Sequence, residues 1–134
     1  MTLTLMLDTN AISSIIRAPD GSVAKRLRLQ ADGAACMSIL TLAELRFGAA
    51  RVSSRRISQK IDQLVEIIPA LPLQPPAEDR YARIRTELEA RGTPIGPMDL
   101  LIAAHALALD LTLVTANLGE FSRVPNLRVE NWLD

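Results

Sequence analysis

The chain has 134 residues, of which 15 are basic and 15 acidic, with one histidine, one cysteine and a hydrophobic fraction of 49%. This length and composition fit one folded domain over residues 1–134 and exclude an intrinsically disordered protein. The single cysteine, Cys36, excludes a disulfide scaffold, and the zero net charge excludes a wholly basic polymer binder, although a local basic face stays possible.

The amino-terminal segment does not resemble a signal peptide, and no apolar stretch is long enough to span a membrane. The apolar residues Leu3–Leu7 have no basic flank and stop at Asp8, which is unlike a signal peptide. The longest later apolar stretch, 100–109, has about half the length that a bilayer requires. We therefore expect a soluble cytoplasmic protein with no membrane segment.

Short apolar runs alternate with longer amphipathic runs along the chain. The apolar runs predict strands at 3–7, 35–39, 70–73, 111–115 and 127–129. The amphipathic runs predict helices at 9–16, 22–31, 41–49, 55–68, 77–90 and 98–109, with a turn or short helix at 117–121. This alternation is typical of a three-layer α/β/α fold, in which helices cover both faces of a mainly parallel sheet.

Four acidic residues lie just beyond predicted strands or in the first turns of the helices that follow them. They are Asp8, Glu44, Asp99 and Glu120. Ligands of open parallel sheets bind at the carboxyl ends of the strands, so we expect these four side chains to converge there. Thr115 and Asn117 follow the strand at 111–115 and would border the same place.

Clustered carboxylates repel one another unless a cation neutralises them. Carboxylates without histidine or cysteine ligands suit Mg²⁺ or Mn²⁺ rather than zinc. We expect Asp8 and Asp99 to hold the metal directly, and Glu44 and Glu120 to hold its waters or a second ion. Such a site activates water for hydrolysis of a phosphodiester or another phosphoryl group.

Each acid also has a purely structural interpretation. Asp8 can cap the following helix, Glu44 can close a capping box with Thr41, and Asp99 can stabilise a helix amino terminus. Glu120 can do the same three residues after Asn117. The position of all four at one expected edge favours the metal site.

The remaining chemistry-bearing residues favour structural roles. His105 lies among alanines and leucines and predicts a packed, hydrogen-bonded histidine, and Cys36 predicts a core residue. The chain has no phosphate-binding glycine loop and no Cys/His metal spacing. These absences argue against an NTPase, a dehydrogenase or a zinc protein.

The charge is unevenly distributed along the chain. Residues 1–60 contain nine basic and four acidic residues, and the segment from Arg46 to Lys60 contains no acidic residue. These bases are Arg46, Arg51, Arg55, Arg56 and Lys60. They can bind a nucleic-acid backbone, or they can be a solvated helical corner or an interface for an acidic partner. Base stacking has few candidates, and Phe47 and Tyr81 favour core or interface positions.

Four segments together resemble the motifs of the VapC branch of the PIN-domain family. The first is Asp8-Thr9-Asn10 after a short apolar strand, and the second is Ser38-Ile39-Leu40-Thr41-Leu42-Ala43-Glu44 with the residues after it. The third runs from Ile95 through Asp99 to Ala106, and the fourth from Leu113 through Glu120 to Trp132. Their order covers essentially the whole chain, which makes the resemblance specific.

The resemblance implies a ribonuclease toxin of a type II toxin–antitoxin pair. It implies that Asp8, Glu44 and Asp99 form an acidic site, with Asn117 or Glu120 in the fourth position. Thr9, Asn10, Thr115 and Asn117 would orient these carboxylates. In the fourth motif Ala116 stands where the branch often has an asparagine.

The resemblance also implies the partners. They are an RNA substrate, a VapB-like antitoxin whose carboxyl-terminal segment covers the site, and a second copy of the chain, with DNA bound only through the antitoxin. Our leading hypothesis is a Mg²⁺-dependent endoribonuclease. The alternative is a non-toxic binding module that acts with its antitoxin in a DNA-binding regulatory complex. A phosphatase built on Asp8 is disfavoured, because no Asp-x-Asp pair follows and the second half of the chain lacks lysine.

Overall fold

A five-stranded parallel sheet forms the centre of the computed structural model, which describes residues 2–133. The strands are β1 (Leu5–Leu7), β2 (Ala35–Ser38), β3 (Ala70–Leu71), β4 (Thr112–Val114) and β5 (Val129–Glu130). Their spatial order is β3-β2-β1-β4-β5, and Leu5 of β1 pairs with Ala35 of β2 on one side and with Thr112 of β4 on the other. The order reverses beside β1, so the ligand-binding crevice of this fold lies beyond β1 and β4.

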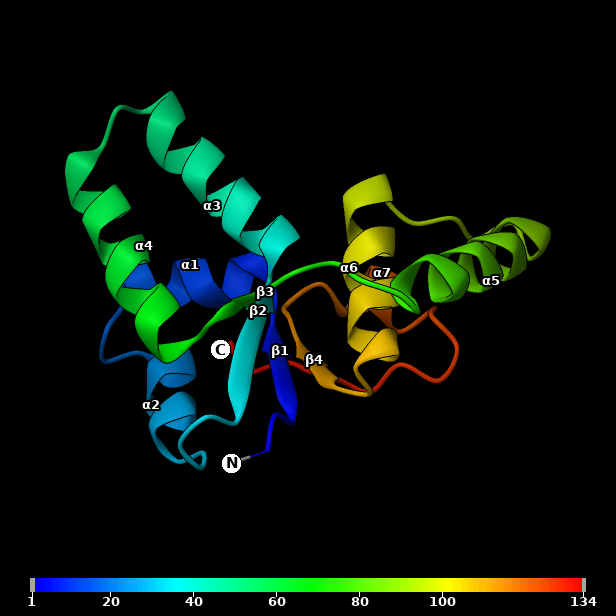
Figure 1. Ribbon diagram of the computed structural model, residues 1–134, viewed down its shortest axis with the longest axis horizontal. Helices are drawn as coiled ribbons and strands as arrows, with labels where there is room; N and C mark the ends of the chain where they lie inside the picture. Colours follow the sequence, from blue (N-terminus) through cyan, green and yellow to red (C-terminus); the bar gives the residue numbers. More distant parts are fainter. Residues whose placement is uncertain (1, 134) are drawn as a thin grey trace.

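Helices connect the strands and cover both faces of the sheet (Figure 1). They are α1 (Thr9–Arg17), α2 (Ser22–Arg28), α3 (Ile39–Arg51), α4 (Arg55–Ile67), α5 (Ala77–Ala90), α6 (Pro97–Ala108) and α7 (Leu118–Phe121). Figure 1 shows α3 and α4 side by side at one flank of the sheet and α5 against α6 at the other. The predicted three-layer α/β/α fold is confirmed.

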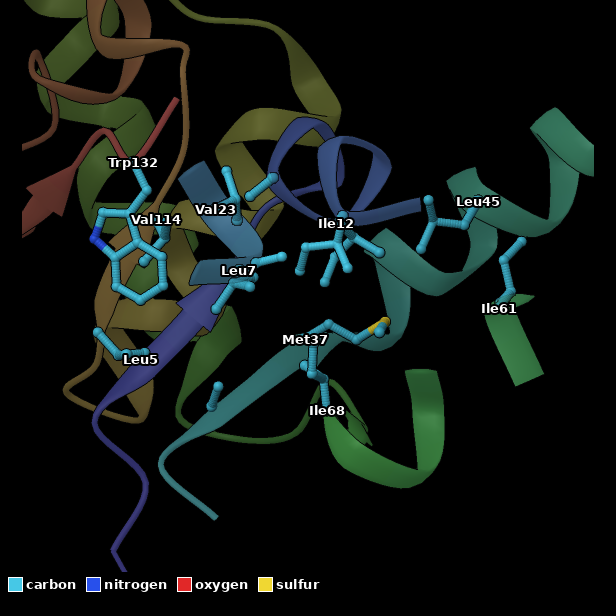
Figure 2. Close-up of a cluster of buried hydrophobic side chains, with 14 of the residues drawn as sticks. Leu5, Leu7, Ile12, Val23, Met37, Leu45, Ile61, Ile68, Val114 and Trp132 are labelled. Atoms are coloured by element: carbon cyan, nitrogen blue, oxygen red, sulfur yellow. The ribbon is translucent and has the colours of Figure 1, made fainter. Parts of the chain in front are cut away.

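Alternation along β1 divides the apolar core into two layers. Leu5 and Leu7 pack with Ile12, Met37 and other residues from α1 to α4, in the cluster that Figure 2 shows. Met6 points to the opposite face, where it joins a second cluster from α5, α6 and α7. The residues of β1 and β2 are all buried, as expected for parallel strands covered by helices on both sides.

Some helices and strands begin at other residues than predicted, because of local capping and turn geometry. Helix α3 begins at Ile39 rather than at 41, because the Ser38 hydroxyl caps it by accepting a hydrogen bond from the amide of Leu40. The last strand begins at Val129 rather than at 127, since a turn with Asn126 at a φ of 67° precedes it. Helix α5 has the predicted bounds.

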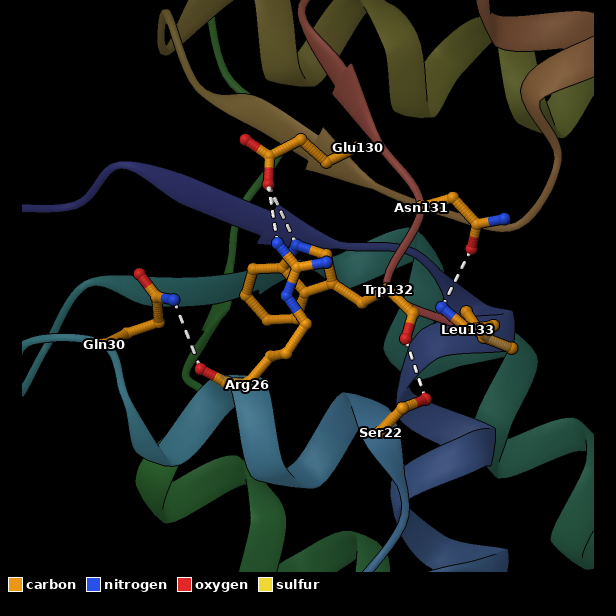
Figure 3. Close-up of polar contacts among 7 residues, drawn as sticks. All are labelled: Ser22, Arg26, Gln30, Glu130, Asn131, Trp132 and Leu133. Carbon is orange, nitrogen blue, oxygen red and sulfur yellow. Dashed lines mark hydrogen bonds and ion pairs between the residues drawn. The ribbon is translucent and has the colours of Figure 1, made fainter.

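The carboxyl-terminal segment is fixed to α2 by a small polar network (Figure 3). The buried Trp132 donates from Nε1 to Glu130 at 2.9 Å, and its carbonyl accepts from the Ser22 hydroxyl at 2.8 Å. The guanidinium of Arg26 lies 5.1 Å from the centroid of the Trp132 ring and 3.8 Å from the Glu130 carboxylate. These contacts hold the segment around Trp132 against α2.

Within residues 2–133, none of the helices combines the length and the apolar character that a bilayer crossing demands.

Candidate active site

Asp8 stands at the junction between β1 and α1. Its Oδ1 accepts a hydrogen bond from the Thr9 amide at 2.8 Å, so it caps α1 as its structural interpretation expected. Its Oδ2 accepts from the Thr115 hydroxyl at 2.9 Å, and its side chain is buried. Asp8 therefore caps α1 with one carboxylate oxygen and contacts the end of β4 with the other.

Thr115 is the hub of the contacts around Asp8. Its hydroxyl donates to Asp8 and accepts from the side chain of Asn10 at 3.1 Å and from the amide of Asn117 at 3.0 Å. Asn10 in turn accepts from the amide of Ala116 at 2.9 Å. The one hydroxyl proton and the two lone pairs of Thr115 are thus all used, which fixes the end of β4 against the start of α1.

Glu44 reaches the same edge from the second turn of α3. It accepts a hydrogen bond from the Thr9 hydroxyl at 2.5 Å, which links α3 to α1. The predicted capping box between Thr41 and Glu44 is absent, because Ser38 is the helix cap and Thr41 lies inside the helix. Glu44 is therefore available to the site rather than committed to the helix end.

Asp99 and Glu120 share a hydrogen-bond donor. Asn117 bridges them, since its Nδ2 donates to Asp99 Oδ2 at 3.1 Å and to Glu120 Oε2 at 3.2 Å. The amide of Gly96 donates to Glu120 Oε1 at 3.3 Å. A Cβ at Gly96 would lie 3.9 Å from both carboxylates, so the loop before α6 runs directly beside them.

The pKa values report how strongly these acids interact. Burial raises the pKa of Asp99 to about 7, with a proton shared with Glu120 and the negative charges of Asp8, Glu120 and Glu44 as further causes. The hydrogen bond with Asp99 lowers the pKa of Glu120, so the pKa values of the two acids are shifted in opposite directions. Burial also raises the pKa of Asp8, to which the charge of Glu44 adds. Four separate segments thus contribute to one negative potential.

The donor set fits a hard divalent cation that keeps part of its water shell. Among residues 2–133, no three His, Cys, Asp or Glu side chains are close enough together to ligate one ion. Mg²⁺ needs only one or two carboxylates, with waters completing its octahedron. Asp8 and Asp99 fit that requirement, because both are held by neighbouring donors and both carry raised pKa values that a cation would lower.

The predicted basic segment forms the α3–α4 pair. Arg46 and Arg51 lie on α3, and Arg55, Arg56 and Lys60 lie on α4. Arg46 forms an ion pair with Asp62 at 2.6 Å, which neutralises part of the predicted surface. Phe47 is 65% exposed and lies beside the guanidinium of Arg51, so it is not a core residue, and the interface alternative stays a prediction.

Two further residues with polar contacts, one of them beside Glu120, were not predicted as site residues. Arg123 follows Glu120 by three positions; its charge contributes to the lowered pKa of Glu120, and its Nη1 donates to the carbonyl of Pro94 at 3.2 Å. Ser38 contacts His105 Nδ1 at 2.9 Å, which joins the start of α3 to α6 and confirms His105 as a packed, hydrogen-bonded residue. The spacing of Arg123 from Glu120 is the one sequence signal that could have indicated its place.

Comparison with known proteins identifies the family of this fold. The PIN-domain family model matches residues 5–127. The chain is 39% identical to a tRNA(fMet)-specific endonuclease VapC from Shigella flexneri and 38% identical to ribonuclease VapC2 from Rickettsia felis, with at least 95% of each chain covered in both comparisons. A crystal structure of DNA-bound VapBC from Salmonella typhimurium superposes with a TM-score of 0.90 at 35% identity, over 97% of this chain and 98% of that one. The chain therefore belongs to the PIN-domain family, and within it to the VapC ribonucleases.

Proposed function

We propose that the chain is a divalent-metal-dependent endoribonuclease toxin that cuts a transfer RNA. The observation that carries this proposal is that Asp99 is under the influence of the charges of Asp8, Glu44 and Glu120, which come from three other segments of the chain. The names of the relatives support RNA as the substrate, and two of them specify tRNA(fMet). Mg²⁺ is the ion we propose, with Mn²⁺ as a substitute, because the ligands are carboxylates.

The residues of the site divide the work by position. Asp8 and Asp99 would hold the ion, while Glu44 and Glu120 would accept protons or hydrogen bonds from waters beside it. Thr115 and Asn117 orient the two metal-binding carboxylates through their hydrogen bonds. A bound divalent ion supplies a water of lowered pKa and stabilises charge on the phosphoryl oxygens.

The side chains that hold these carboxylates contribute without touching the substrate. Thr9 fixes one oxygen of Glu44, and Asn10 fixes Thr115. Such outer contacts orient metal ligands and raise metal affinity. The basic residues of α3 and α4 (Arg46, Arg51, Arg55, Arg56 and Lys60) would attract the RNA backbone. Arg55 and Arg56 are both exposed at the start of α4.

We also propose a VapB-like antitoxin as partner and a homodimer as the assembly. The solved neighbours include VapBC complexes, some with DNA, which supports an antitoxin partner for this chain. An antitoxin arginine entering between the acids would neutralise them as a cation does. A purely regulatory, non-toxic role is not favoured, because such a role gives the four acids no function.

Cleavage of a tRNA(fMet) transcript tests the proposal. We expect cleavage with Mg²⁺ or Mn²⁺, none with EDTA, and a loss of at least 100-fold for Asp8→Asn and Asp99→Asn on the scale of lost charge stabilisation. Asp20→Asn is the matched control, because this aspartate is 97% exposed and lies outside the site. Cleavage that persists in EDTA and in both site variants would contradict the proposal.

A further inference from the structure

A cavity of about 250 Å³ lies on the other side of the loop that borders the acids. Its floor is apolar and consists of Leu88 from α5, Ile95 from the loop and Leu100 from α6. Its rim carries Tyr81, Arg85 and Glu89, all on α5. We name this cavity the α5–α6 pocket. The site described above does not use it.

The rim of the α5–α6 pocket is already ordered for a flat ligand. Arg85 donates from Nη1 to the Tyr81 hydroxyl at 2.7 Å and from Nε to Glu89 Oε2 at 3.2 Å. Its guanidinium carbon lies 5.9 Å from the centroid of the Tyr81 ring. An aromatic ring and a planar guanidinium are the two protein groups on which unpaired nucleobases stack. Because these side chains are held by one another, little rotamer entropy is lost when a base binds.

The chemistry of the rim also includes an acceptor for a base edge. Glu89 is exposed and uses one carboxylate oxygen for Arg85, which leaves Oε1 to accept a hydrogen bond. Carboxylates accept from the exocyclic amino group of cytosine and can accept from other base amines in the same way. The apolar floor and the polar rim together match a nucleobase, which has apolar faces and a polar edge.

One loop joins the pocket to the acids. Pro94, Ile95 and Pro97 line the pocket. Gly96, between them, faces the opposite way and donates to Glu120. Pro97 starts α6, and Asp99 follows two residues later. A nucleotide next to the cleaved bond can therefore place its base in the pocket while its phosphate stays near the acids.

Arg123 lies where that phosphate would pass. Its Nη1 is 3.2 Å from the carbonyl of Pro94, a lining residue of the pocket, and its side chain is exposed. It lies on the α7 side of the acids, whereas the basic residues predicted from the sequence lie on α3 and α4. A cation in this place can bind a backbone phosphate adjacent to the cleaved one.

We propose that the α5–α6 pocket binds one unpaired nucleobase of the RNA beside the cleaved bond, and that Arg123 binds the phosphate connected to it. This inference rests on the proposed ribonuclease function and adds a specificity site to it. A second copy of the chain is the competing occupant of the pocket, and the experiment below separates the two.

The test combines protein variants with abasic substitutions in a tRNA(fMet) transcript around its mapped cleavage site. We expect one abasic position to lower kcat/KM of the unchanged protein by about tenfold, the scale of one lost stacking contact. Tyr81→Leu should lower kcat/KM on the intact RNA by about tenfold. For this variant, the abasic substitution at that position should cause no further decrease in kcat/KM. Tyr81→Phe keeps the ring but removes the hydroxyl that holds Arg85, so it should lose less than Tyr81→Leu and should keep its sensitivity to that abasic position. Arg83→Ala is the matched control, since Arg83 is an exposed residue of α5 that pairs with Asp79 outside the pocket.

Binding measured without cleavage keeps this inference separate from the proposed function. Fluorescence anisotropy of the same RNAs on the Asp99→Asn protein should show the same pattern, and Arg123→Gln should reduce the salt dependence of binding by about one phosphate contact. Absence of cleavage with this binding pattern would refute only the proposed catalysis. Equal abasic sensitivity of the unchanged protein and Tyr81→Leu would overturn the pocket assignment. A smaller mass for Tyr81→Leu in sedimentation would also overturn it, by making the pocket a subunit interface.

Discussion

Replacing Asp99 by asparagine should stabilise the metal-free protein at alkaline pH. Burial and neighbouring acids raise the pKa of Asp99 from 3.8 to about 7, so the folded state holds a proton that the unfolded state has released. Where the folded state binds more protons, stability falls as pH rises. The loss therefore accumulates between about pH 4 and pH 7 and is complete above pH 7. Asparagine removes the charge and keeps the shape.

The magnitude follows from the size of the pKa change. About three pH units correspond to ~4 kcal/mol, because each unit is worth ~1.4 kcal/mol. Asp99 is only half-buried, so solvent screening reduces this to an expected gain of ~1–2 kcal/mol at pH 8. At pH 4 or below, where Asp99 is protonated in the folded state, the two proteins should have nearly equal stabilities.

Urea unfolding with EDTA present, at pH 4, 6 and 8, measures this difference. His105 has a pKa lowered by burial and makes both proteins less stable as pH falls, so only the difference between them is informative. Asp20→Asn removes the same charge from an exposed position and should show no such gain. If Asp99→Asn is no more stable than the unchanged protein at pH 8, the acids do not repel one another as argued. In a separate measurement without EDTA, we expect added Mg²⁺ to stabilise the unchanged protein at pH 8 and to have much less effect on the stability of Asp99→Asn.

Three further predictions concern the supporting contacts. Thr115→Val should weaken Mg²⁺ binding by about tenfold in calorimetry, because Asp8 loses its hydroxyl donor, whereas Thr115→Ser should bind normally; equal affinities would contradict the hub role. Ser38→Ala should cost ~1–2 kcal/mol in urea unfolding, because it removes the cap of α3 and leaves His105 Nδ1 without its partner; an unchanged midpoint would refute this. In urea unfolding, Trp132→Ala should lower the free energy of unfolding by ~3–5 kcal/mol, because it empties a buried position. Arg26→Ala should lower it by less than ~1 kcal/mol, because it removes an exposed ion pair. Similar decreases for the two variants would show that the cation rather than the ring holds the carboxyl-terminal segment.

The place of each acid could be predicted because it depends on local sequence. Asp8 directly follows a short buried strand, and Asp99 follows the proline that starts α6. In a parallel sheet, both positions lie at the same edge whatever the details of packing. The elements themselves were predictable for the same reason, since the apolar runs are short and the helical repeats are long.

The pairing of side chains could not be predicted because it depends on how α6 and α7 pack. Sequence left Asn117 and Glu120 as alternatives for the fourth position, whereas in the structure Asn117 bridges Asp99 to Glu120. The partner of Arg46 also depends on packing, because Asp62 lies on the other helix of the α3–α4 pair. A single chain read alone contains no signal for either contact.

The raised pKa of Asp99 connects catalysis to inhibition in the proposed function. Repulsion between the acids raises the free energy of the folded protein, and any cation that enters between them lowers it again. A divalent ion and an arginine from an antitoxin would both obtain this stabilisation from the same carboxylates. Each must displace the proton of Asp99 to bind, so both affinities should fall as pH decreases below about 7. Because the two cations need the same space, the affinity for the antitoxin should fall when the Mg²⁺ concentration rises. The affinity for Mg²⁺ should fall by the same factor when the antitoxin is bound.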